Sequence, residues 1–267
     1  MKKEVLNNIF IVLFIILYLF AMYIIEPVVV GNIKILSLIA GIVAIIIFLI
    51  AKYKTKDKEK IKKQIVLLII ALGVIIRGMY IVYTPISQRQ HDVYSIQDQG
   101  HLGYIYTIFE TGKLPETNDI QFYHPPLHHF ISAQWLRIGD FLNIDIERNI
   151  EGVQVLTAIY SSLIILVVWQ ILKHIKIKDI YKILIIAIIS FHPTFIIFAG
   201  LINNDILMTL LTFVIILYLL RWHEEANLKN TIILALSTRI MCYDKSIWCC
   251  YSHTNTICVL YKNVRNL

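Results

Sequence analysis

The feature that constrains this chain most is a series of apolar runs, each close to the roughly 20 residues that cross a bilayer. The runs cover residues 9–25, 33–51, 65–83, 153–172, 183–201 and 206–220, and a further stretch begins at Thr231 and fades. Of the 267 residues, 58% are hydrophobic and only 16% are charged, against about 25% charged in a soluble domain. The pattern excludes a disordered chain, a collagen and a small disulfide scaffold. It predicts an all-α integral membrane protein, a multi-pass helix bundle of about six or seven spans with an outer loop of juxtamembrane amphipathic helices.

The lysines predict how the chain is oriented in a cell membrane. Residues 52–63 hold seven lysines, which is typical of a cytoplasmic loop. The N-terminus is then cytoplasmic, and residues 84–152 are extracytoplasmic. The net charge of +7 comes from such loops. Because no basic stripe interleaves with exposed aromatic residues, no nucleic-acid partner is expected.

Residues 127–142 leave one alternative open in this topology. As an interfacial helix, the segment lets the lysines of residues 173–182 return to the cytoplasm. As a short span, it would place those lysines outside. The polar side chains of His128, Gln134 and Arg137 favour the interfacial helix.

The segment 84–152 carries most of the candidate chemistry, including five of the nine histidines. Residues 100–112 read as an amphipathic helix that ends at Gly112. The run Tyr123-His124-Pro125-Pro126-Leu127 is a rigid element that starts the next helix. Asp92 follows the third apolar run, where a carboxylate at a membrane surface can serve as a general base. A loop acid of this kind can also simply cap a helix.

These elements, in this order, resemble the C superfamily of membrane glycosyltransferases (GT-C), and more closely the bacterial relatives of dolichyl-phosphate-mannose protein mannosyltransferases. The matching pieces are the apolar run 65–83, Asp92, the helix 100–112 and His124-Pro125-Pro126-Leu127. Further along, Pro193 within a span and Asn204-Asp205 at its outer end fit the same pattern. The resemblance covers roughly residues 65–237.

The resemblance implies transfer of a sugar from a polyprenyl-phosphate-linked donor to an acceptor at the outer membrane face. The acceptor (protein, lipid or glycan) is not identified. By resemblance, Asp92 is the catalytic base or the carboxylate that orients the acceptor. Asp205 is a second acidic residue of the catalytic site, facing the same outer cavity. The implied substrate-binding residues are His91, His124, Pro125, Pro126, Arg77 and Asn204. No P-loop or G-x-G-x-x-G motif indicates nucleotide use.

Two features of these residues leave alternatives open. Arg77 lies within an apolar run, so it requires a partner or a phosphate, unless it snorkels to the outer interface. A divalent metal is possible among His91, Asp92, Asp98, His101, His124, His128 and His129. Polar interface residues are the commoner role for such histidines, so we assign no metal ligand.

The chain divides into three parts. Residues 1–64 hold two membrane helices and the lysine-rich loop, and residues 65–237 form the GT-C-like core. Residues 238–267 contain all four cysteines and no clear periodicity. One choice of codons from Arg239 onward, read after one base is deleted, encodes an uninterrupted apolar helix. We therefore expect a frameshift near this codon and a truncated, inactive copy of the enzyme. A genuine hydrophilic tail is the alternative.

Two other classes of function remain open. A transporter would place charged residues within spans and show repeat symmetry, but Arg77 is the one such charge in the sequence and no repeat is visible. A non-enzymatic envelope scaffold would not require the ordered Asp, His and Pro-Pro elements.

Overall fold

The all-helical character predicted from the sequence is confirmed for the described part of the chain. The computed structural model describes residues 2–29, 33–53, 57–84, 100–116, 122 and 124–243. Every regular element in these ranges is an α-helix. In chain order the helices are α1 Lys2–Val29, α2 Ile33–Tyr53, α3 Lys58–Tyr83, α5 Gly100–Thr111, α6 Pro126–Phe141, α7 Ile146–His174, α8 Asp179–Phe191, α9 Pro193–Phe198, α10 Asp205–Glu224 and α11 Leu228–Tyr243.

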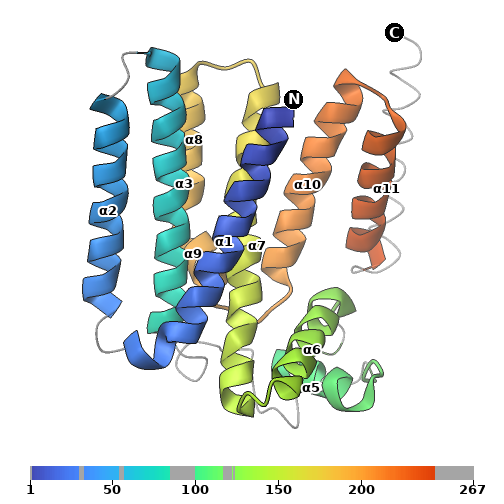
Figure 1. The fold of residues 1–267 in the computed structure, drawn as a ribbon. Helices are drawn as coiled ribbons and strands as arrows, with labels where there is room; N and C mark the ends of the chain where they lie inside the picture. The colour runs from blue at the N-terminus through green and yellow to red at the C-terminus, as the bar shows by residue number, and fades with distance from the viewer. Residues whose placement is uncertain are drawn as a thin grey trace.

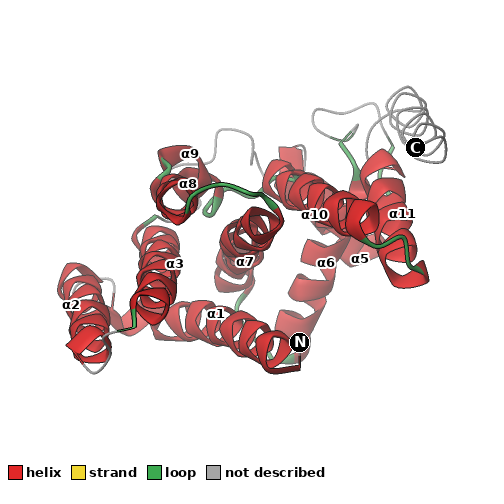
Figure 2. Ribbon diagram, turned by 90° about the horizontal axis from the view of Figure 1, so that it is seen from above, coloured by secondary structure: helices red, strands yellow, loops and turns green. Residues whose placement is uncertain are grey.

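Helix α7 lies at the centre of the bundle. Seen along the helix axes, α1, α3, α8 and α10 surround α7, whereas α2 lies outside α3 and α11 outside α10 (Figure 2). The main buried cluster joins Leu19 of α1, Val74 of α3, Ile165 of α7, Ile186 of α8 and Leu210 of α10. Full burial of such a side chain contributes about 1.5–3 kcal/mol. The apolar run that includes residues 153–172 is therefore the part of the sequence on which the bundle is built.

Successive long helices alternate in direction, which divides the connecting segments between two ends of the bundle (Figure 1). At one end, Lys62 Nζ of α3 lies 2.6 Å from Asp179 Oδ2 of α8, and His174 Nδ1 of α7 lies 2.8 Å from Glu224 Oε2 of α10. At the opposite end, α5 and α6 lie beside the beginning of α7 (Figure 1). The lysine-bearing ends of α3 and α8 thus lie at the opposite end of the bundle from α5 and α6. Which end faces the cytoplasm stays a prediction.

Among the residues that the structure describes, three helices are long and apolar enough to cross a membrane. They are α3, α7 and α10. Within α1 and α2, the described side chains form shorter apolar stretches, Ile11–Ile24 and Ile39–Ile50. These lengths support an association with a membrane. The bundle of six or seven spans and the location in a cell membrane stay predictions.

The apolar run 183–201 is not one continuous helix, although the sequence predicts a single span with a kink at His192-Pro193. Helix α8 ends at Phe191 and α9 begins at Pro193. Proline has no N–H and its ring clashes with the preceding turn, so it does not continue a helix. The Thr194 N–H donates to His192 Nδ1 at 3.3 Å, which caps the new helix. The expected kink is a full break.

The helices predicted within the segment 84–152 are confirmed. Helix α5 covers the expected residues and ends before Gly112, whose φ of 69° lies in the left-handed region that favours glycine. Pro126 occupies the first turn of α6, and His124 precedes the helix. The position of α6 relative to a membrane is not tested.

The end of α11 differs from the expectation. The sequence predicts a change of character after Ser237, but the helix continues to Tyr243. The Thr238 hydroxyl donates to the Leu234 carbonyl at 2.8 Å, a hydrogen bond compatible with helical backbone. Helix formation does not depend on the reading frame, so the frameshift stays a prediction. Residues 244–267 lie outside the described ranges.

Candidate functional site

Helices α5 and α6 form a layer that packs against α7 and against the turn before α10. Leu102 and Ile105 of α5, Leu136 of α6, Val153 of α7 and Ile202 of the turn belong to one buried cluster. This cluster is separate from the core of the bundle. It positions every candidate site residue described below except Arg77.

Hydrogen bonds and one close contact fix α6 in this layer. Arg137 Nη2 donates to the Ile108 and Phe109 carbonyls at the end of α5, at 3.0 and 3.2 Å. The Ile108 carbonyl also accepts from the Gly112 N–H at 3.0 Å. On the other side of α6, Gly139 lies so close to the Asn149 side chain that a Cβ at Gly139 would clash with it. Helix α6 is therefore fixed to both of its neighbours.

Four histidine rings gather where α5 meets the beginning of α6. His101 Nδ1 lies 2.9 Å from His129 Nε2, and the two rings stack with centroids 5.1 Å apart. The His124 ring lies 5.0 Å from that of His101, and the His128 ring lies 5.6 Å from that of His129. The rings of His101, His128 and His129 are buried. We call these four residues the histidine cluster.

The hydrogen bonds of the cluster define its tautomers. The Pro125 carbonyl oxygen can only accept, so His129 Nδ1 carries a hydrogen and donates to it at 3.0 Å. In a neutral ring, His129 Nε2 must then accept, and His101 Nδ1–H donates to it at 2.9 Å. The lone pair of His101 is therefore on Nε2. These assignments follow from the network of partners.

Burial keeps these rings neutral. It lowers the pKa of His101 to about 4, with a smaller contribution from the nearby His124. It lowers the pKa of His128 to about 3, with a smaller contribution from His101. The pKa of His129 also lies well below its ordinary value, mainly because the ring is buried. A charged imidazolium would lose its hydration in this environment.

Aromatic rings enclose the histidine cluster. The Tyr104 ring stacks on His129 with centroids 4.1 Å apart, and the Tyr160 ring of α7 meets His128 edge-on at 6.1 Å. His128 Nδ1 is buried without a hydrogen-bond partner. The Ser132 hydroxyl lies 3.5 Å from His128 Nε2, at the limit of a hydrogen bond. The cluster therefore contains one polar atom whose hydrogen-bonding capacity is unused.

The predicted pair Asn204 and Asp205 lies at the same end of the bundle. Ile202, two residues before Asn204, packs into the cluster shared by α5 and α6. The Asn204 side chain is buried and its Oδ1 has no partner, whereas the Asp205 side chain is exposed in the first turn of α10. A carboxylate at this position is favourable because it faces the positive end of the helix dipole.

Arg77 lies apart from this layer, inside the bundle. Its side chain is fully buried, so it does not snorkel to an interface. Nε donates to Ser161 Oγ at 2.7 Å, and Nη1 donates to the Gly73 and Ser190 carbonyls at 2.9 and 2.8 Å. Nη2 donates to the Ile189 carbonyl at 3.3 Å. The predicted partner of Arg77 is therefore the chain itself.

The break at Pro193 explains these contacts. In a continuous helix, the Ile189 carbonyl would accept from residue 193, which as proline has no N–H. The Ser190 carbonyl would accept from Thr194 N–H, which donates to His192 instead. Arg77 donates to both carbonyls. The guanidinium thus replaces the two helical donors that the break removes.

The structure brings only part of the predicted site together. His124, Pro125 and Pro126 lie at the histidine cluster, Asn204 and Asp205 lie at the same end, and Arg77 is elsewhere. His91 and Asp92 lie outside the described residues. Within the described ranges, no group of three His, Cys, Asp or Glu side chains could hold a metal ion. The possible divalent metal therefore gains no support here.

Sequence reasoning did not assign a role to the ring stack of His101, Tyr104 and His129. The available indication was the concentration of histidines in residues 84–152. Spacing within one helix could not reveal the stack, because His101 and His129 come from different helices. Ser161 was also missed, since a serine in an apolar run carries no pattern of its own.

The chain was also compared with known proteins. No family model, no curated protein and no solved structure matches it. In the described part of the chain, the structure supports the class of a helical protein with three helices long and apolar enough to cross a membrane.

Proposed function

We propose that the chain is the N-terminal part of an integral-membrane glycosyltransferase that uses a polyprenyl-phosphate-linked sugar. In this reaction Asp92 accepts the proton of an acceptor hydroxyl, whose oxygen forms a bond to the anomeric carbon of the sugar. The bond from that carbon to the phosphate oxygen breaks, and polyprenyl phosphate leaves with the electron pair. The use of a lipid-linked sugar, the acceptor hydroxyl and the position of Asp92 beside them all belong to this proposal.

One observation supports this proposal most. Ile202 packs into the buried cluster of α5 and α6. The packing brings Asn204-Asp205 to the end of the bundle that holds His124-Pro125-Pro126, although these elements are far apart in the sequence. The family resemblance requires them to face one outer cavity. The lysine-bearing ends of α3 and α8 lie at the other end (Figure 1), in agreement with the positive-inside rule.

The test uses two forms of the gene: the 267-residue chain, and a form with one base removed near codon 239. Each is purified and incubated with polyprenyl-phosphate sugars carrying a radioactive label, together with membrane extract as acceptor source. We expect transfer by the shifted form, its loss in Asp92→Asn, and no transfer by the 267-residue chain. Asp57→Asn at the lysine-bearing end is the matched control. Transfer that persists in Asp92→Asn would contradict the proposed base.

A transporter is the second candidate, and the position of the buried Arg77 beside the break between α8 and α9 favours it. Buried charges and discontinuous helices are common at the substrate sites of transporters. Here, however, the donors of Arg77 bond the carbonyls of the broken helix itself. Solute uptake into vesicles that contain the purified chain, abolished by Arg77→Gln, would favour this function. Sugar transfer lost in Asp92→Asn would favour the enzyme.

A further inference from the structure

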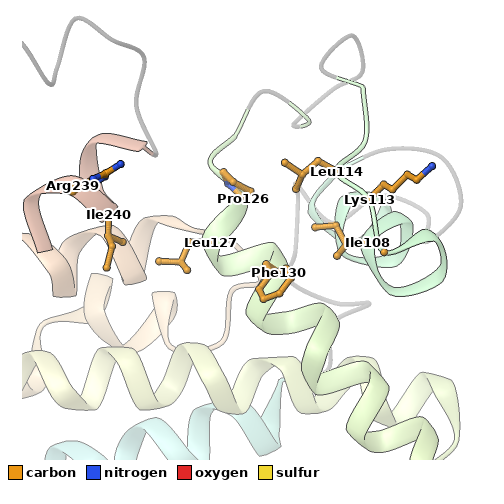
Figure 3. A pocket seen from close by; sticks show the side chains of 9 residues that line it. Ile108, Lys113, Leu114, Pro126, Leu127, Phe130, Arg239 and Ile240 are labelled. Atoms are coloured by element: carbon orange, nitrogen blue, oxygen red, sulfur yellow. The ribbon is translucent and has the colours of Figure 1, made fainter. Parts of the chain in front are cut away.

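A pocket lies between α11 and the α5–α6 layer (Figure 3). Its volume is about 480 Å³, within the range of small-molecule sites. Ile108 and Leu114 line it near the end of α5, Leu127 and Phe130 line it on α6, and Ile240 lines it on α11. Figure 3 shows Leu127 and Ile240 pointing toward one another across the gap between their helices.

Two cations complete the lining. Lys113 lies on the α5 side and Arg239 on the α11 side (Figure 3). Both side chains are exposed, and no acidic residue is among the described residues that line the pocket. An apolar interior with cations at its edges is complementary to an anion that carries an apolar chain.

The position of the pocket agrees with such a ligand. Helix α11 runs antiparallel to α10, so its end, where Arg239 lies, comes level with the beginning of α10 (Figure 1). Helix α10 is long and apolar enough to cross a membrane. If α10 spans the bilayer, the pocket lies at the depth of the lipid headgroups on that side.

The exposed face of α6 supports this depth. Phe130, Ile138 and Phe141 are 50%, 59% and 84% exposed. Their spacing places them on one side of the helix. A helix with an exposed apolar face can lie in the membrane interface. Lipid would then border the pocket directly.

We propose that this pocket binds one anionic phospholipid of the surrounding bilayer. The anionic headgroup of the lipid lies at the edge of the pocket, which Lys113 and Arg239 flank from opposite sides, and the first part of an acyl chain fills the apolar interior. This inference does not depend on glycosyl transfer. It concerns the 267-residue chain as its sequence stands, because Arg239 belongs to the segment 238–267 whose reading frame is in question.

The experiment is native mass spectrometry of the purified 267-residue chain, after removal of bound lipid. Phosphatidylglycerol and phosphatidylcholine with identical acyl chains are added separately. We expect one phosphatidylglycerol per chain and weak binding of phosphatidylcholine. The double variant Lys113→Gln/Arg239→Gln should bind phosphatidylglycerol about 30-fold more weakly, since each cation near an anionic lipid contributes roughly a fivefold factor.

The matched control is Lys176→Gln/Lys229→Gln, which removes two exposed lysines away from the pocket and lowers the net charge equally. This variant should bind as the unmodified chain does. A third variant, Leu127→Trp, fills the apolar interior and keeps both cations. It should also weaken binding, and it remains informative if the double variant does not fold.

Three results would overturn the proposal. The first is equal binding of the two phospholipids, or equal losses in the double variant and its control. The second is preferential binding of polyprenyl phosphate, displacing phosphatidylglycerol in competition, which would assign the pocket to a donor lipid. The third is a dimer in the same spectra that the double variant or Leu127→Trp abolishes, which would assign the pocket to a second copy of the chain.

Discussion

Two regions of this molecule bury polar side chains, and they do so in opposite ways. At the helix break, Arg77 remains charged and donates four hydrogen bonds to the chain. In the histidine cluster, burial lowers the pKa values of His101 and His128 to about 4 and about 3, so the rings stay neutral at pH 7. The difference shows that a buried cation requires acceptors that another element has left unpaired.

The acceptors at the break come from one proline. Pro193 removes a helical donor, and the two freed carbonyls of α8 accept from Arg77. In the histidine cluster, by contrast, the ring of His129 donates to the Pro125 carbonyl, which is a single backbone acceptor. The neutral rings therefore form one chain of hydrogen bonds, which runs from His101 through His129 to the Pro125 carbonyl.

The largest expected effect is loss of stability in acid, caused by the histidine cluster. Between pH 6.5 and 4 the unfolded chain binds protons at these histidines and the folded chain does not. The free energy of unfolding therefore has its full value above about pH 6.5. It falls with decreasing pH, by about 1.4 kcal/mol per pH unit for each histidine. Urea unfolding in detergent at several pH values measures the slope.

The matched control for this slope is His223→Gln, an exposed histidine at the other end of the bundle. It should leave the pH dependence unchanged. His128→Phe should flatten the slope, since it removes one titrating ring and keeps its contact with Tyr160. An equal slope in all three proteins would show that the cluster does not control acid stability.

The next effect concerns the break. Arg77→Met should destabilise the fold by about 3 kcal/mol, because two buried carbonyls lose their donors. In the background of Pro193→Ala, a continuous helix can supply those donors, so the same change should cost less. A double-mutant cycle measured by unfolding in detergent gives the coupling. Additive effects of the two changes would mean that Arg77 does not compensate for the break.

These two regions also mark what the sequence could predict. The interruption at Pro193 and the start of α6 at Pro126 could be predicted from the sequence, because proline acts on its own segment of the chain. The apolar runs predicted the helices because they, too, are a property of one segment. The partners of Arg77 and the stacking of His101 on His129 depend on how separate helices pack. No alternation or spacing within one segment encodes those contacts.

The candidate site was predicted only in part for a related reason. The grouping of Asn204-Asp205 with His124-Pro125-Pro126 came from a family resemblance, and the packing of Ile202 agrees with it. The assignment of Arg77 to substrate came from its charge alone. Charge does not distinguish a ligand from the carbonyls of a broken helix, which are equally good acceptors.

A smaller effect is expected within the histidine cluster at neutral pH. His129→Phe keeps the ring stack with Tyr104 but leaves the His101 N–H and the Pro125 carbonyl without partners. The expected loss is about 2 kcal/mol. Adding His101→Phe should cost little more, because that change removes the unpaired donor. If the double variant loses the sum of the two single effects in the same unfolding assay, the hydrogen bond between the rings is not the source of stability.

The smallest effect is expected at the lysine-bearing end, where ions meet in water. Lys62 Nζ lies within 2.7 Å of Glu59 Oε1 and 2.6 Å of Asp179 Oδ2, but all three side chains are substantially exposed. Exposed ion pairs gain little because solvent and salt screen them. Lys62→Met should therefore change the unfolding midpoint no more than Lys63→Met, because Lys63 forms no ion pair with any residue that the structure describes. A clear loss at Lys62 alone that persists in 0.5 M salt would mean that this end of the bundle excludes solvent more than its exposure indicates. The contrast between a buried, fully bonded cation and a solvated one would then be smaller than the structure implies.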